Sequence, residues 1–73
     1  MLRDISKEEL QAMANEKGSH SEPIKELIKF CNEMETDVRV SLKTYTNGTE
    51  CLVVYVYDTL LRRYRTYEKI YLD

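Results

Sequence analysis

The side chains best suited to covalent or metal chemistry in this sequence are Cys31, Cys51 and His20. A thiol activated by an imidazole base is a nucleophile, and the same two residue types are common zinc ligands. A structural zinc site needs four ligands, whereas the 73 residues include two cysteines and one histidine. The elements expected below put His20 in a loop and Cys31 on the buried stripe of a helix. We therefore predict two reduced, half-buried thiols, with no metal and no cofactor.

Carboxylates occur in pairs, as Glu8 with Glu9 and Glu22 with Glu26, and these pairs are typical of solvated helix faces and of partners for the N-terminal end of a helix dipole. A phosphate-binding glycine loop, a dinucleotide-binding glycine fingerprint, HExxH and G-x-S-x-G are all missing from the sequence. A chain this short also has difficulty enclosing a substrate pocket on the order of several hundred Å3. We predict that the protein is not an enzyme.

Tyrosine is the residue type that stands out. The sequence holds six tyrosines, one phenylalanine and no tryptophan, and all six tyrosines lie between residues 45 and 71. The same half of the chain is the more basic one: residues 1–36 carry 5 Lys/Arg and 8 Asp/Glu (net −3), and residues 37–73 carry 6 and 5 (net +1). Because tyrosine and arginine are frequent at the energetic centres of protein interfaces, this half is the candidate for binding.

Overall composition indicates one small folded domain over residues 1–73. Hydrophobic residues make up 42% and charged residues 33%, with two glycines and one proline, which excludes collagen-like, linker-like and proline-rich classes. The net charge of −2 argues against a dedicated nucleic-acid-binding protein, which is usually strongly basic. The N-terminal residues lack the apolar core of a signal peptide, and no apolar stretch is long enough for a membrane span. We expect a cytoplasmic protein without membrane association.

The first half of the chain predicts two helices. Ser6 and Glu9 match a capping box, in which the Ser6 hydroxyl accepts from the Glu9 N–H and the Glu9 carboxylate returns to the Ser6 N–H. Gly18 suits the left-handed end of a helix, so the first helix is expected over about 7–17.

A second helix is expected over about 22–35, with Ser21 as its cap. Phe30 lies off the centre of its apolar stripe, and we expect this ring to pack on the first helix or on a partner. The stripe itself consists of Ile24, Leu27, Ile28, Cys31 and Met34.

From Asp37 onward the apolar period changes from 3.6 to 2, which predicts strands over about 37–46, 50–57 and 62–72. A three-residue loop over Thr46–Gly48 would put Leu42 opposite Leu52, whereas a two-residue Asn47-Gly48 turn would put Leu42 opposite Val53. We prefer the three-residue loop because it gathers six aliphatic side chains on one face. For residues 60–68 a helix remains an alternative.

These elements predict an α+β fold in the order ααβββ, with two N-terminal helices packed on one face of a three-stranded antiparallel β-meander. In the third strand, alternation directs Tyr64, Ile70 and Leu72 toward the helices, with Thr66 and Glu68 between them. The opposite face of the sheet is then aromatic and basic, and it consists of Arg39, Ser41, Lys43, Tyr45, Cys51, Val53, Tyr55, Tyr57, Arg63, Arg65, Tyr67, Lys69 and Tyr71.

We expect a non-enzymatic protein-binding module that acts through this face or through an open sheet edge. In size and character the chain resembles accessory proteins of phages, prophages and plasmids, many of which inhibit a host protein, although no site residue follows from that resemblance. The alternatives are nucleic-acid binding, with bases stacked on the tyrosines, and a structural homodimer. The expected contact residues are Arg39, Lys43, Tyr45, Tyr55, Tyr57, Arg65 and Tyr67.

Overall fold

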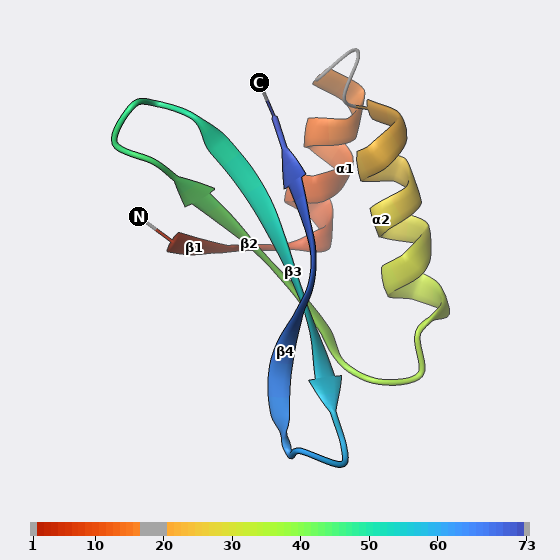
Figure 1. The fold of residues 1–73 in the computed structure, drawn as a ribbon. Coiled ribbons are helices and arrows are strands. Elements are labelled where there is room, and N and C mark those ends of the chain that lie inside the picture. The colour runs from red at the N-terminus through yellow and green to blue at the C-terminus, as the bar shows by residue number, and fades with distance from the viewer. Residues whose placement is uncertain (1, 17–20, 73) are drawn as a thin grey trace.

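The computed structural model describes residues 2–16 and 21–72. Within these residues the elements are β1 (Leu2–Ile5), α1 (Lys7–Glu16), α2 (Ser21–Glu33), β2 (Val38–Thr44), β3 (Glu50–Asp58) and β4 (Arg63–Tyr71). The strands form one antiparallel sheet in the order β1-β2-β3-β4, and the helices lie side by side in a second layer (Figure 1). The expected α+β class is confirmed.

The expected number of strands and their order are wrong, because a fourth strand precedes the helices. Residues Leu2–Ile5 pair antiparallel with β2, with Ile5 opposite Val40. Of these four residues only Ile5 is buried, so β1 carries no apolar alternation that a sequence pattern could reveal. Its backbone partner lies more than thirty residues away, and the pairing exists only once the helices have turned the chain back.

The N-terminus of α1 forms as expected on one side of the capping box. The Glu9 N–H donates to the Ser6 hydroxyl at 3.2 Å, and the Leu10 N–H donates to the Ser6 carbonyl at 3.0 Å. The Glu9 carboxylate instead accepts from Arg3 of β1 at 2.9 Å, so the reciprocal bond is replaced by an exposed ion pair. The expected helix end at Gly18 and the His20 loop lie outside the described residues.

The preferred register of the central hairpin is confirmed. Leu42 lies opposite Leu52, and the Tyr45 N–H donates to the Thr49 carbonyl at 2.8 Å across a three-residue loop. Gly48 occupies this loop with φ of +90°, a conformation that glycine adopts without the penalty of a Cβ.

The last strand is present as expected, and the helical alternative for residues 60–68 is excluded. A bulge changes its alternation, however. Val54 lies opposite Glu68 while the next residue, Tyr55, lies opposite Thr66, so Tyr67 is an extra residue on β4. Because one inserted residue exchanges the two faces of a strand, every side chain of β4 before Tyr67 lies on the face opposite to the one expected.

Buried side chains from both layers form a single core. The largest fully buried ones include Leu10 and Ile24 from the helices and Leu52 and Val54 from the centre of the sheet. This core lies toward one end of β3 and β4, and the hairpin that joins them extends past the helices (Figure 1). The remaining core residues are Ile5, Ala14, Leu27, Val40, Leu42 and Ile70.

Candidate functional site

The side of the sheet away from the helices is called here the outer sheet face. Among the described residues, both helices lie on the other side (Figure 1). Four of the expected contact residues, Arg39, Lys43, Tyr55 and Tyr57, do lie on the outer face. The pairing register places on it Leu2, Asp4, Arg39, Ser41, Lys43, Cys51, Val53, Tyr55, Tyr57, Tyr64, Thr66, Lys69 and Tyr71.

One end of the outer sheet face carries a connected cluster of aromatic and charged side chains. The Tyr57 and Tyr64 rings meet edge to face with centroids 5.2 Å apart. The Arg39 guanidinium lies over the Tyr64 ring, 4.7 Å from its centroid, and also 3.5 Å from the Asp37 carboxylate. The Tyr64 hydroxyl in turn donates a hydrogen bond to Asp37. The four side chains of this cluster therefore fix one another's positions through these contacts.

The same contacts shift the ionisation of Asp37 and Tyr64. The hydrogen bond from Tyr64, followed by the nearby Arg39, lowers the pKa of Asp37 below its usual value. The pKa of Tyr64 is raised, because the hydroxyl that donates to Asp37 resists losing its proton. Around neutral pH this cluster therefore presents the ionised Asp37 carboxylate, the Arg39 guanidinium and the neutral Tyr64 phenol.

A hollow of about 380 Å3 occupies the middle of the outer sheet face. Its floor is Val53, which is only 3% exposed although no described helix covers it. Lys43 and Lys69 line the hollow, and neither amino group is in an ion pair with a described residue. The other lining residues are Leu2, Tyr55 and Thr66. The hollow therefore combines an apolar floor with a positively charged rim.

Long neighbouring side chains explain why the floor of this face is buried. Cys51 is fully buried between its cross-strand partners Lys43 and Tyr71. Ser41 is also buried, and its hydroxyl donates to the Asp4 carboxylate of β1 at 3.0 Å. The outer sheet face is consequently ordered by contacts between its own residues rather than by a second layer.

Tyr45 follows β2 and continues this surface. The Lys43 ammonium lies 5.0 Å from the centroid of the Tyr45 ring, a cation–π contact. This contact directs Lys43, one of the two lysines that line the hollow, toward the Tyr45 ring.

The bulge removes Arg65 and Tyr67 from the expected face. Arg65 lies opposite Val56 on the helical side of the sheet and pairs with Asp58 at 3.3 Å. Tyr67 stacks on Phe30 of α2, with ring centroids 4.8 Å apart and planes at 14°. The Phe30 ring, which was expected to pack on the first helix or on a partner, has its aromatic contact on the sheet. In exchange, Tyr64 and Thr66 join the outer sheet face, and the one-residue shift that puts them there has no signature in the sequence.

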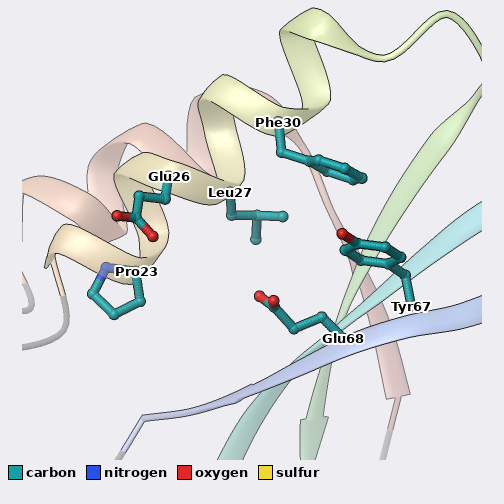
Figure 2. Close-up of a pocket in the computed structure, with 6 residues that line it drawn as sticks. All are labelled: Pro23, Glu26, Leu27, Phe30, Tyr67 and Glu68. Atoms are coloured by element: carbon teal, nitrogen blue, oxygen red, sulfur yellow. The ribbon is translucent and has the colours of Figure 1, made fainter.

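The Phe30–Tyr67 stack forms the wall of a second hollow, of about 220 Å3, between α2 and β4 (Figure 2). Glu26 and Glu68 stand at its margin, one from each element (Figure 2). We call this hollow the acidic pocket, and it is lined by Pro23, Glu26, Leu27, Phe30, Tyr67 and Glu68.

Of the residues first considered for covalent or metal chemistry, Cys31 and Cys51 lie in different layers of the fold, and His20 lies outside the described residues. Cys51 is buried in the sheet, and Cys31 is half-buried on α2, where burial raises the pKa of its thiol. No group of three or more His, Cys, Asp or Glu side chains within residues 2–16 and 21–72 could hold a metal ion. None of the described helices is long and apolar enough to cross a membrane.

Comparison of the chain with protein-family models, with curated proteins and with solved structures finds no match in any of the three.

Proposed function

We propose that the protein is a small protein-binding module that uses its outer sheet face. The observation that carries this proposal is the hollow over Val53, where an apolar floor lies between Lys43 and Lys69. An apolar side chain of a partner would fill the hollow, and acidic groups beside that side chain would meet the two ammonium groups.

The aromatic cluster at one end of the face supports the same function. Tyr57 and Tyr64 are already fixed by contacts with each other, Arg39 and Asp37. Side chains that are ordered before binding lose little conformational entropy when a partner arrives. Tyrosine rings with few rotatable bonds and an adjacent arginine are typical of the residues that dominate binding energy.

Nucleic-acid binding is the competing function for this face, because exposed rings and basic groups also suit bases and phosphates. Protein binding is favoured, since the face also carries the carboxylates of Asp4 and Asp37, which repel a phosphate backbone. The chain as a whole is also net negative.

The experiment is affinity capture from a lysate of the source organism, with and without nuclease. The informative variant reverses both rim charges, Lys43→Glu with Lys69→Glu. The matched control, Lys25→Glu with Lys29→Glu, makes the same charge change on α2, away from the outer sheet face. We expect at least one protein to be recovered by the native chain and by the control, with nuclease present, and lost with the rim variant.

Two outcomes would overturn the proposal. Equal recovery of every protein by the rim variant and the control would show that the hollow is not the binding surface. Recovery that depends on nucleic acid, and affinity that falls steeply with salt, would replace the proposal by nucleic-acid binding.

A further inference from the structure

The turn between β3 and β4 presents apolar side chains to solvent. Leu60 is 92% exposed and Leu61 is 50% exposed, and Arg62 and Arg63 follow them directly. We call these four residues the tip. The tip projects past the end of the helical layer, so no described element shields it (Figure 1). A single exposed leucine is ordinary on a protein surface, but two adjacent ones form a contiguous apolar patch, which is a candidate contact surface.

The tip is held in one conformation by Asp58. The Asp58 carboxylate accepts hydrogen bonds from the N–H groups of Leu60 at 2.9 Å and Leu61 at 3.0 Å. Its other oxygen pairs with Arg65 at 3.3 Å. These contacts fix the backbone that carries the two leucines, so the tip is presented in an ordered form before it meets anything.

The acidic pocket has the opposite character to the tip in both charge and shape. It is a hollow of about 220 Å3, whereas one water molecule occupies only about 30 Å3 in the liquid, so it has room for an aliphatic side chain. Its walls are the Phe30 and Tyr67 rings and Leu27. Its carboxylates, Glu26 and Glu68, form no ion pair with any described residue.

The two arginines of the tip likewise form no ion pair within the part of the chain described. One molecule therefore carries both an apolar tip with two unpaired positive charges and an apolar pocket with two unpaired negative charges. The tip does not occupy the pocket of its own chain, since Leu60 is 92% exposed. Seven positions along the chain, most of them in the extended β4, separate Leu61 from Glu68, which is about 23 Å at roughly 3.3 Å per residue.

From this complementarity we propose that two copies of the chain associate, with the tip of each inserted in the acidic pocket of the other. Because tip and pocket lie at different positions along the same edge strand, an antiparallel arrangement of the two β4 strands about a two-fold axis makes both insertions at once. Leu60 fills the space beside Phe30 and Tyr67, and Arg62 and Arg63 meet the partner's Glu26 and Glu68. The association buries the exposed leucines and pairs the two arginines of each tip with the two glutamates of the facing pocket.

The proposal is tested by the mass of the full chain in solution, measured by light scattering and sedimentation over a dilution series. The native chain is expected to be a dimer that dissociates on dilution. Arg62→Glu with Arg63→Glu puts acidic groups against an acidic pocket, and Glu26→Lys with Glu68→Lys puts basic groups against a basic tip. Each variant alone is expected to weaken association at least tenfold.

An equal mixture of these two charge-reversed variants provides the decisive measurement. In a mixed dimer the Glu-bearing tip meets the Lys-bearing pocket, and the native tip meets the native pocket, so association is expected to return. The control Lys25→Glu with Lys29→Glu carries the same net charge change as the tip variant, but outside the lining of the pocket, and it is expected to dimerise normally. Circular dichroism confirms that each variant is folded.

A native chain that stays monomeric at millimolar concentration overturns the proposal. It is also overturned by dimers that neither reversal weakens, and by a mixture that does not associate although both variants are folded. The outer sheet face is a separate surface, so Lys43→Glu with Lys69→Glu is expected to leave the dimer intact. Failure of the dimer and failure of the proposed function are thereby distinguished.

Discussion

Tyr67 of β4 stacks face to face on Phe30 of α2, with ring centroids 4.8 Å apart. This contact joins the helical layer to the edge strand of the sheet, and it forms a wall of the acidic pocket (Figure 2). It depends on the bulge, because Tyr67 is the extra residue of β4 and has no partner across β3. A local irregularity of one strand thus provides an aromatic bridge between the two layers.

The stack is expected to contribute modestly to stability. Aromatic pairs contribute about 0.5–1.5 kcal/mol beyond the area they bury, and Tyr67 is 61% exposed, so the lower part of that range applies. A double-mutant cycle of Tyr67→Ala and Phe30→Leu, followed by urea denaturation, is expected to give a coupling of about 0.5 kcal/mol. A coupling indistinguishable from zero would show that the two rings are adjacent without stabilising each other.

The Asp37–Tyr64 hydrogen bond predicts a pH dependence with a definite sign. The pKa of Asp37 is lowered in the folded state. Its contribution to the stability of the fold is therefore fully present above the ordinary pKa of 3.8 and is lost as pH falls through the folded pKa. Tyr64→Phe removes the main cause and is expected to move the pKa of Asp37 back toward 3.8, as measured by NMR titration. Arg39 remains beside the carboxylate, so the return is partial.

At alkaline pH the Asp37–Tyr64 hydrogen bond predicts a loss of stability as pH rises. The pKa of Tyr64 is raised in the folded state. Its contribution to the stability of the fold is therefore fully present below the ordinary pKa of 10.0 and is lost as pH rises through the folded pKa. An Asp37 titration that is unchanged by Tyr64→Phe would contradict both expectations, because each rests on one hydrogen bond.

The two thiols are expected to differ in reactivity. Cys51 is fully buried beneath Lys43 and Tyr71, so it should react with a thiol reagent only when the chain unfolds. Cys31 is half-buried with a raised pKa, and its labelling at neutral pH should be slow and should accelerate as pH rises. Mass spectrometry of the labelled peptides measures both rates. Labelling of Cys51 in the native chain as fast as Cys31 would show that the outer sheet face opens readily.

Two leucines provide a matched test of the core. Leu52 is fully buried at the centre of the sheet, and Leu52→Ala is expected to lower the free energy of unfolding by about 2–5 kcal/mol. Leu60 is 92% exposed, and Leu60→Ala should change that free energy by less than about 0.5 kcal/mol in the dissociated chain. Chains of this length have a total free energy of unfolding of roughly 4–11 kcal/mol, so Leu52→Ala removes a large part of the stability of the fold. Thermal unfolding at high dilution compares the two variants, and equal losses would contradict the assignment of the core.

Features that depend on residues close together in the chain were predictable from the amino-acid sequence alone. The Ser6 cap depends on residues three positions apart, and the apolar period of α2 depends on residues three and four apart. The β2–β3 register was also predictable, because a one-residue slip would expose the whole apolar set around Leu42 and Leu52. The α+β class and the outward direction of Arg39, Lys43, Tyr55 and Tyr57 followed from these features.

Features that depend on distant partners required the folded chain. β1 is four residues long with one buried side chain, and it becomes a strand only because β2 offers a free edge beside it. The bulge at Tyr67 lets that ring reach Phe30 on a helix more than thirty residues away, and it reverses the directions of Tyr64 and Arg65. Strand alternation is a local rule, whereas the place where it breaks is set by packing against another layer. Most residues of the site could therefore be recognised within residues 37–72, whereas its final membership was decided by one residue of register in β4 and by Leu2 and Asp4 of β1.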